Sequence, residues 1–357
     1  MLQSLDWLFH KTQAPNHGAA QLALHRQSIL TKPSGSLGRL ESLVVQLAGH
    51  QGNPVPAIHA PHISIFAADH GVAALGVSAY PQSVTAQMLA NFSAGGAAIC
   101  VLAKQHAAAL SVVDVGVLGG NEALAGVRRS KVAQGTSCFT ECPAMSETQL
   151  SAALSVGFEA VQAAKAQGCD LFIAGEMGIG NTTSASALAC AVLGSHPRQL
   201  VGRGTGVNLA AYQRKISLIA QALSHHQTVV AGKNPTDILA ALGGFEIAAI
   251  TGAAIACAQA GITFLVDGFI ATVATLLAVK INPAVRHWCV FAHQSAEYGH
   301  QAVMAALHAK PLMQLDMRLG EGSGAALALP LIRAACDLHA NMATFAEAGV
   351  SNKGESV

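Results

Sequence analysis

The sequence predicts an α/β fold: a three-layer, Rossmann-like parallel sheet between helices, with a small helical domain built from both termini. Three observations support this prediction. Short apolar runs alternate with longer alanine-rich segments along the middle of the chain. Each apolar run is followed by a cluster of polar residues or glycines. The 357 residues are 52% hydrophobic and only 11% charged, which is enough apolar material for one large core.

Five apolar runs are expected to form buried strands, because continuous apolar strands alternating with helices are typical of a parallel sheet covered on both faces. In chain order these runs are 62–67, 110–113, 171–174, 262–266 and 288–292. The clusters that follow them are 69–71, 114–116, 175–176, 267–268 and 293–295. Open parallel sheets bind ligands at the carboxyl ends of their strands, so we expect these clusters to converge on one crevice.

The two ends of the chain differ from its middle. Residues up to about 51 are expected to form helices separated by KPSGSLGRLE, and a long helix is expected after Pro330, with a second one around 342–348. We expect these ends to pack together. The predicted division is a small helical domain of residues 1–55 plus 331–357 and a large α/β catalytic domain of residues 56–330.

Composition argues against several classes of protein. The formal net charge of +1 and the 4% aromatic content lack the basic stripe and the stacking residues of nucleic-acid binding. The eight cysteines lie mostly in apolar runs without a CxxC pair, as reduced core residues of a cytoplasmic protein do. Neither they nor the sixteen histidines show metal-ligand spacing, so no metal is expected. The first ten residues carry Asp6 and no apolar core, unlike a signal peptide.

Residues 247–266 contain no charge and are numerous enough to cross a bilayer. The segment is rich in Ala, Gly and Thr, however, and Gly261 separates it from the β-branched and aromatic run ITFLV. A helix, a glycine cap and a buried strand therefore explain it better than a membrane span.

Two carboxylates stand between or beside glycines at the start of a helical segment. Glu321 lies between Gly320 and Gly322 in LGEGSGAALALPLIRAA, and Glu176 follows Gly175 in GEMGIGNTTSASALA. Glycines let other molecules approach the backbone closely, so either carboxylate is a candidate general base. A turn with ordinary helix capping is the alternative.

The glycine-rich segments also predict an anion site. In the second of these motifs Asn181, Thr182 and Thr183 are suitable N-cap residues, so the loop can present N–H groups and hydroxyls to a phosphate. The segment VGRGTGVNLAAYQRK repeats the pattern, with Lys215 inside the following helix as a possible charge partner. An exposed surface lysine is the alternative for Lys215. The motifs match neither a Walker loop nor a GxGxxG fingerprint.

No acidic doublet of the kind that holds ribose and magnesium in pyrophosphate-dependent phosphoribosyltransferases is present. The residues alone thus indicate an α/β enzyme that binds a phosphorylated small molecule. Two rivals stay open: a sensor of phosphorylated ligands without turnover, and a nicotinamide-cofactor dehydrogenase.

Nine motifs in order, spanning about residues 30 to 335, resemble the nicotinate-nucleotide:dimethylbenzimidazole phosphoribosyltransferase family of cobalamin biosynthesis. They are KPSGSLGRLE, AADHGV, GVSAYPQSVTAQM with GGAAI, GEMGIGNTTSASAL, VGRGTGV, GGFEIAAITGA, VDGFI, HQSAEYGH and LGEGSGAAL. In one departure, Cys138 stands where the family's Gly-Thr-x-Asn element has Asn.

The resemblance implies the fold described above, a cytoplasmic homodimer, and a pentosyltransferase without a cofactor. Its substrates would be nicotinate mononucleotide and 5,6-dimethylbenzimidazole, with α-ribazole 5′-phosphate and nicotinate as products. Glu321 matches the family's catalytic glutamate, with Glu176 as a secondary carboxylate or ribose ligand. The implied nucleotide-binding residues are Gly178, Gly180, Asn181, Thr182, Gly204, Lys215, Asp267 and Ser295. The implied benzimidazole-binding residues are Tyr80, Gln87, Met177 and Leu319.

Overall fold

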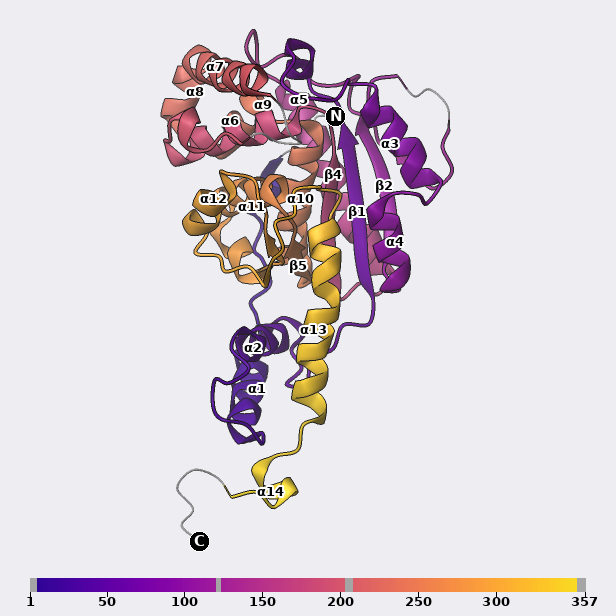
Figure 1. Cartoon of the computed structure of the whole chain (residues 1–357), viewed down its shortest axis with the longest axis vertical. Coiled ribbons are helices and arrows are strands. Elements are labelled where there is room, and N and C mark those ends of the chain that lie inside the picture. The colour runs from indigo at the N-terminus through magenta and orange to yellow at the C-terminus, as the bar shows by residue number, and fades with distance from the viewer. Residues whose placement is uncertain (1–4, 120–122, 203–207, 352–357) are drawn as a thin grey trace.

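In the computed structural model, which describes residues 5–119, 123–202 and 208–351, a six-stranded parallel sheet has the order β3-β2-β1-β4-β5-β6 (Figure 1). All five expected strands are confirmed. The strands are β1 (Pro61–Ala68), β2 (Ala109–Gly116), β3 (Val127–Arg129), β4 (Leu171–Met177), β5 (Thr263–Val266) and β6 (Cys289–Phe291). The strand order reverses between β1 and β4, where ligand crevices of such sheets lie.

Both faces of the sheet are buried, because successive side chains of each strand join different cores. On β1, Ile63 and Ile65 belong to one apolar cluster, whereas Phe66 belongs to the other. On β4, Ile173 and Phe172 divide in the same way. This period of two explains why the strands are apolar without interruption.

Helices cover the two faces unequally. The face with Phe66 is covered by α5 (Glu147–Ala166), α6 (Asn181–Leu193), α7 (Leu209–His225), α8 (Gln227–Gly232), α9 (Pro235–Leu242), α10 (Phe245–Ala260), α11 (Phe269–Ile281) and α12 (His300–Ala306). The opposite face is covered by α2 (Arg39–Gln51), α3 (Val84–Ser93), α4 (Ala98–Gln105) and α13 (Ser323–Asn341). The short 3-10 helices are η1 (Leu5–Phe9), η2 (Gly71–Leu75), η3 (Pro197–Gln199) and η4 (Pro283–Trp288).

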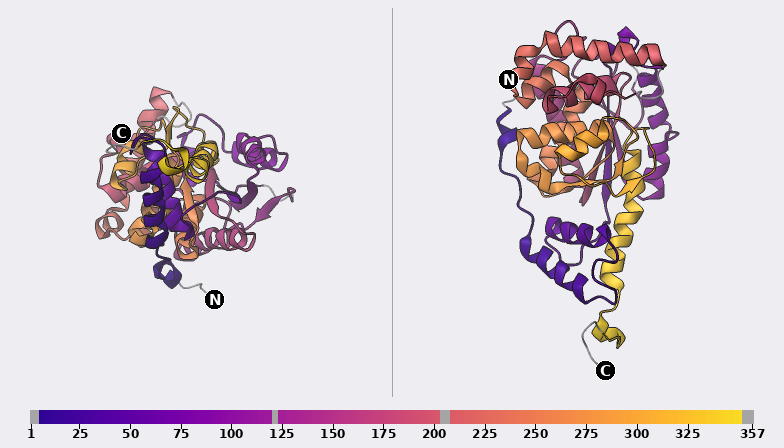
Figure 2. Two further views of the ribbon diagram at one scale, coloured as in Figure 1. Left: turned by 90° about the horizontal axis from the view of Figure 1, so that it is seen from below. Right: turned by 60° about the vertical axis from the view of Figure 1, so that its left-hand side comes forward.

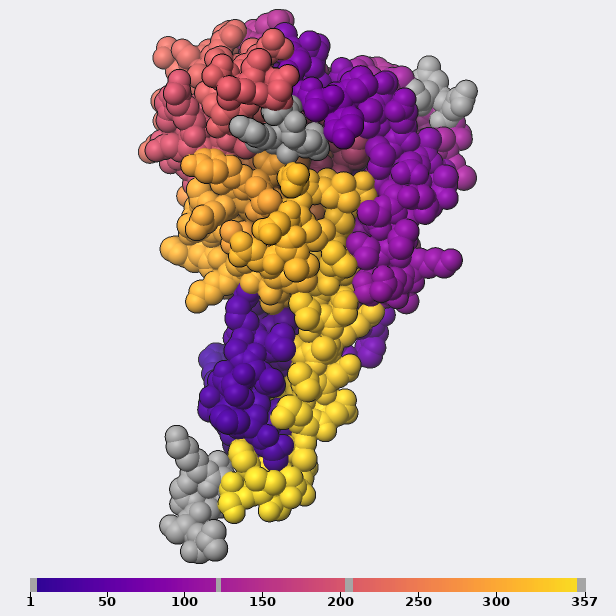
Figure 3. Space-filling model, in the orientation of Figure 1, coloured from indigo at the N-terminus to yellow at the C-terminus, as the bar shows by residue number. Residues whose placement is uncertain are grey.

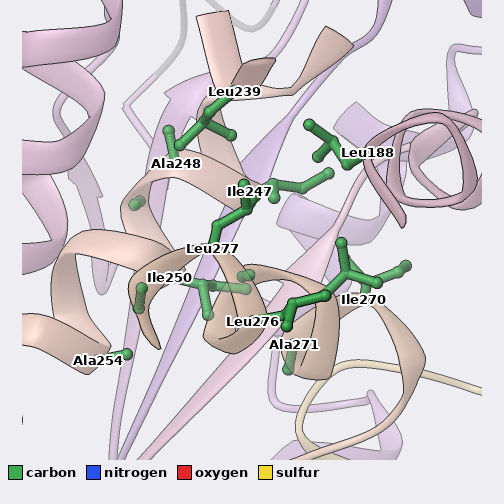
Figure 4. Close-up of a cluster of buried hydrophobic side chains, with 14 of the residues drawn as sticks. Leu188, Leu239, Ile247, Ala248, Ile250, Ala254, Ile270, Ala271, Leu276 and Leu277 are labelled. Atoms are coloured by element: carbon green, nitrogen blue, oxygen red, sulfur yellow. The ribbon is translucent and has the colours of Figure 1, made fainter. Parts of the chain in front are cut away.

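The charge-free segment 247–266 contributes a helix and a strand to this core, as expected from the sequence. It does not form the alternative, a membrane span. It forms α10, ends at Gly261 in the left-handed conformation, and continues into β5. A Cβ on Gly157 of α5 or on Gly252 of α10 would collide with the backbone of the other helix, so glycine allows the two helices to touch. Figure 4 shows α10 side chains meeting those of α6, α9 and α11.

One other stretch, Val84–Gln105, is long and apolar enough to pass a membrane-span test by length and composition. It consists of the two separate helices α3 and α4, and a single such stretch is weak support for a span.

The structure differs from the sequence-based expectation in one helix boundary, one edge strand and one strand pair. The helix expected after Pro330 begins at Ser323 and runs through Pro330, whose ring is exposed while Leu329 and Ile332 pack in the core. Packing on both sides of the proline thus outweighs its missing N–H. The edge strand β3 and the strand pair β7 (His293–Gln294) and β8 (Met313–Gln314) were not predicted, because runs of two or three residues carry no period.

Helices from the two end regions of the chain, α1 (His17–Ile29), α2 and the C-terminal half of α13, lie side by side beneath the sheet (Figures 2 and 3). There α1 contacts the end of α13, with Arg26 donating to the carbonyls of His339 and Ala340, and α14 (Phe345–Ala348) follows. The segment before α1 instead reaches the large core, where Leu8 is fully buried. We propose that α1, α2, α14 and the second half of α13 form the small domain, and that the remainder forms the catalytic domain.

His50 joins α2 to the sheet and makes stability depend on pH. Its Nε2–H donates to the His287 carbonyl at 2.7 Å, and Nδ1 contacts the Thr263 hydroxyl at 2.9 Å. Burial lowers the pKa of His50 from 6.5 to about 4. Between these values only the unfolded chain gains the proton, so stability is complete above pH 6.5 and falls by up to about 1.4 kcal/mol per pH unit below it.

We therefore expect the difference in unfolding free energy between the parent and His50→Gln to become smaller as pH decreases from 7.5 to 5. Urea unfolding at several pH values measures this difference. An equal difference at every pH would contradict the prediction.

Candidate active site

A cavity opens at the carboxyl edge of the sheet, beside the strand-order reversal between β1 and β4. It holds about 810 Å³ of empty space, part of it open to solvent. In Figure 3 the α3 segment and the segments from α11 to α13 meet on this face. The lining comes from residues 77–78, 176–182, 267–271, 295, 297 and 318–320.

Two helices point their N-termini at this cavity. Gly180, in the left-handed conformation with a φ of 95°, precedes α6, and Gly268 precedes α11. Neither helix has a side-chain cap, so their first-turn N–H groups and partial positive charge favour an anion. The expectation that Asn181 or the threonines cap α6 was wrong, because Gly180 takes the cap position and Asn181 donates its side-chain amide to Glu176.

Lys215 is buried against the cavity wall and is not an exposed surface lysine. It is only 1% exposed, and its ammonium donates to the Thr182 hydroxyl at 2.8 Å. Burial lowers its pKa to about 8, opposed by the charge of Glu297. Thr182 lines the cavity whereas Lys215 does not, so the amine stands directly behind the first turn of α6.

Asp267 and Ser295 line the cavity, but each already has protein partners. Asp267 Oδ1 accepts the backbone N–H of Ala325 at 2.8 Å, at the start of α13. The Ser295 hydroxyl donates to the Met317 carbonyl and accepts from the Glu297 N–H, both at 3.2 Å. Ser295 can therefore offer a ligand only its remaining lone pair, unless this arrangement changes.

Glu176 is one of three carboxylates that line the cavity, together with Asp267 and Glu297. Burial raises its pKa well above the usual value, and the charges of Glu246, Asp267 and Glu321 raise it further, against the hydrogen bond from Asn181. A Cβ on Gly320 would collide with its Oε1, so glycine lets the 319–322 turn approach this carboxyl group. Glu176 consequently keeps its proton to a higher pH than an exposed glutamate does.

Glu321 lies on the same turn but does not line the cavity. It has a φ of 65°, and its carboxylate accepts a hydrogen bond from the Ile99 N–H in the first turn of α4. Burial raises its pKa, and Asp267 adds to the rise. Its Oε2 has no hydrogen-bond partner among the described residues, although the side chain is buried. Such a group is available to accept a proton.

The cavity unites part of the sequence-predicted set. Glu176, Met177, Gly178, Gly180, Asn181, Thr182, Asp267, Ser295 and Leu319 line it. Tyr80 and Gln87 do not; both are exposed, just before and within α3. Gly204 lies outside the described residues.

The expected convergence of all the polar strand ends was only partly right. Asp114 lies in a smaller hollow beside Arg129, because β2 is one strand further from the reversal point. Asp69 accepts the N–H of Leu118, and His70 forms a buried 2.6 Å ion pair with Glu246. Burial alone would lower the pKa of His70, but Glu246 and Asp69 outweigh it and the pKa is raised.

Sequence reasoning missed two charged residues of the cavity. Arg318, directly before the LGEG motif, contributes an exposed cation, and Glu297 contributes a carboxylate. A Cβ on Gly202 would strike Glu297 Oε2, so that glycine lets the chain approach it. The one available signal was position: both residues lie within or beside motifs of the resemblance.

The part of the chain that the structure describes contains no group of three or more His, Cys, Asp or Glu side chains that could hold a metal ion.

Comparison with known proteins agrees with this geometry. A family model described as phosphoribosyltransferase matches residues 12–350. The nicotinate-nucleotide–dimethylbenzimidazole phosphoribosyltransferase of Pseudomonas putida is 53% identical over 97% of this chain and 98% of its own, and that of Xanthomonas oryzae is 52% identical over 98% and 99%. A crystal structure of the Thermus thermophilus enzyme of this name superposes with a TM-score of 0.89 at 42% identity, covering 95% of this chain and 100% of that one.

Proposed function

This chain belongs to the phosphoribosyltransferase family of the nicotinate-nucleotide–dimethylbenzimidazole enzymes, and from this premise we propose its reaction. It transfers the 5-phosphoribosyl group of nicotinate mononucleotide to 5,6-dimethylbenzimidazole. The products are α-ribazole 5′-phosphate, the nucleotide of the cobalamin lower ligand, and nicotinate.

The chemistry needs one base. A ring nitrogen of the azole attacks C1′ of the ribose with its lone pair, on the face opposite the pyridinium. The bond from C1′ to the pyridinium nitrogen breaks, and its electron pair neutralises that nitrogen, so nicotinate leaves without a general acid. The attacking azole becomes cationic and loses its N–H proton to a carboxylate.

The observation that carries the proposal is that the cavity combines helix N-termini with carboxyl groups. The N-termini of α6 and α11, with Lys215 behind Thr182, suit a phosphate. Beside them the turn at 319–322 lies against the Glu176 carboxyl group and carries Glu321, whose buried side chain is not part of the cavity lining. A phosphate site and two candidate proton acceptors thus lie close together.

We assign the phosphate to the first turn of α6, which includes Asn181 and Thr182 after Gly178 and Gly180. The positive charge of Lys215 acts on the phosphate from behind Thr182, and Arg318 lines the same cavity. Asp267 and Ser295 also line the cavity, and their oxygens can accept from ribose hydroxyls. Gly204 is retained from the resemblance alone.

We assign the base to Glu321. Its buried, partnerless Oε2 and raised pKa support this role. Glu176 is the secondary carboxyl group: its burial and its three carboxylate neighbours, against the bond from Asn181, favour a neutral ribose ligand. A neutral carboxyl group can donate a hydrogen bond but takes up no second proton.

The azole is assigned to the side of Met177 and Leu319 that faces α3 and α4. Met177 packs against apolar residues of this face, and Leu319 is 55% exposed and free to cover a ligand. Tyr80 and Gln87 belong to the segment that enters and forms α3. We also propose that the protein is cytoplasmic and forms a homodimer. Light scattering on the purified chain tests the dimer.

Incubation with nicotinate mononucleotide and 5,6-dimethylbenzimidazole, followed by chromatography of nicotinate and α-ribazole phosphate, tests the reaction. We expect equimolar products, and no nicotinate when the azole is omitted. Nucleotide binding without products would favour a sensor. Binding of NAD with hydride transfer would favour a dehydrogenase.

Turnover is expected to survive exhaustive chelation with EDTA. A pyridinium leaves as a neutral ring, and a monophosphate substrate has no pyrophosphate that a magnesium ion must neutralise. Initial rates before and after chelation measure the effect. Loss of activity that magnesium or zinc restores would contradict the metal-free reaction.

A further inference from the structure

We propose that His300 is a positioning residue that holds three walls of the nucleotide cavity in register through a hydrogen-bond relay. The walls are the start of α11, the 295–297 loop and the 317–320 segment. His300 itself does not line the cavity and has no role in the reaction described above. The inference rests on the proposed nucleotide site.

The first contacts join two of these walls. The backbone N–H of Ser295 donates to His300 Nδ1 at 2.8 Å. His300 Nε2 lies 2.9 Å from the Thr272 hydroxyl, which in turn donates to the Gly268 carbonyl at 2.8 Å. Ser295 and Gly268 both line the cavity. The imidazole therefore bridges the loop after β7 to the N-terminus of α11.

The directions of these hydrogen bonds are compatible with only one protonation state of the His300 imidazole. Nδ1 accepts from an N–H and so carries no proton. The single proton of Thr272 is used on Gly268, so its oxygen must accept from Nε2–H. Only the neutral imidazole protonated on Nε2 satisfies every contact. A second proton on Nδ1 would face the Ser295 N–H without an acceptor.

The surroundings hold His300 in this state. It is fully buried, and burial lowers its pKa to about 4, helped by His293 and opposed by Asp267. The ring of Phe269 packs edge-on against it with centroids 6.4 Å apart. The relay is therefore intact throughout the range from pH 5.5 to 8.

The third wall is attached through Ser295. Its hydroxyl donates to the Met317 carbonyl, and the Ala296 N–H donates to the same carbonyl at 2.9 Å. Met317 precedes Arg318, a cation of the cavity. Displacement of the Ser295 backbone would thus shift Arg318 relative to the N-terminus of α11. The relay should affect phosphate recognition more than proton transfer.

The test is calorimetric binding of nicotinate mononucleotide without azole, combined with steady-state kinetics. His300→Phe retains the ring volume but breaks both bonds, so we expect its Kd and KM for the nucleotide to rise about 10-fold. The azole KM and kcat should stay within about threefold. His300→Asn, which can offer an oxygen near the Nδ1 position, should recover part of the loss. Thr272→Val should cause a smaller rise of the same kind.

His339→Phe is the matched control. His339 is another fully buried histidine with two hydrogen-bonded ring nitrogens, but it lies at the far end of α13. The His339→Phe variant should be less stable than the parent but should bind the nucleotide with an unchanged Kd. If His300→Phe fails to fold, Thr272→Val and His300→Asn carry the comparison.

An unchanged nucleotide Kd in the folded His300 variants would overturn the proposal. So would a fall in kcat alone, or a step in parent nucleotide affinity near pH 6.5 that His300→Asn abolishes. A parent chain that binds the nucleotide but yields no nicotinate would overturn only the proposed reaction. A parent chain that binds no nucleotide would overturn both.

Discussion

Glu321→Gln is expected to lower turnover by about 10² to 10⁴ while leaving nicotinate mononucleotide affinity nearly unchanged. Glutamine preserves the size of the side chain and can still accept the Ile99 N–H, but it cannot take the azole proton. Stopped-time assays of nicotinate release, together with calorimetric binding of the nucleotide, separate these two effects.

The pH profile gives a second readout. The base must be ionised, so activity in the parent should fall as pH drops through the raised pKa of Glu321, and this acidic limb should flatten in Glu321→Gln. Glu176→Gln is the matched control, since it occupies the same corner of the fold. A Glu321→Gln variant with more than about a third of parental turnover would move the role to Glu176.

Removal of the Lys215 charge is expected to weaken nicotinate mononucleotide binding by about 1.5 to 3 kcal/mol, with little effect on the azole. Because the side chain is buried, Lys215→Met is a better variant than Lys215→Ala, since methionine keeps most of the volume. Calorimetry with the nucleotide and with the azole measures both affinities.

The same amine predicts a pH effect. Its pKa is near 8, so nucleotide binding by the parent should weaken as pH rises from 7 to 9, and this dependence should vanish in Lys215→Met. Thr182→Val is the control, because it removes the contact to Lys215 but keeps the charge. Equal affinity of parent and Lys215→Met would show that the buried amine only supports α6.

The sequence by itself determined the layers of this protein. Strand and helix periods are local properties, so the five apolar runs and the polar clusters after them could be identified without knowing their neighbours. The rule that strand ends face one edge then placed Glu176, Asp267 and Ser295 together. Motif order supplied Glu321, which no period or spacing distinguishes from a helix cap.

Only the tertiary structure decided how these groups are used. Lys215 stands in a polar stretch of sequence, yet α7 buries it behind Thr182. Asn181 is a suitable N-cap residue by type, but Gly180 occupies the N-cap position of α6. Such outcomes depend on contacts between residues far apart in the chain, as between His300 and Thr272. Burial, pKa and hydrogen-bond direction are set by those long-range neighbours, and a local pattern does not contain them.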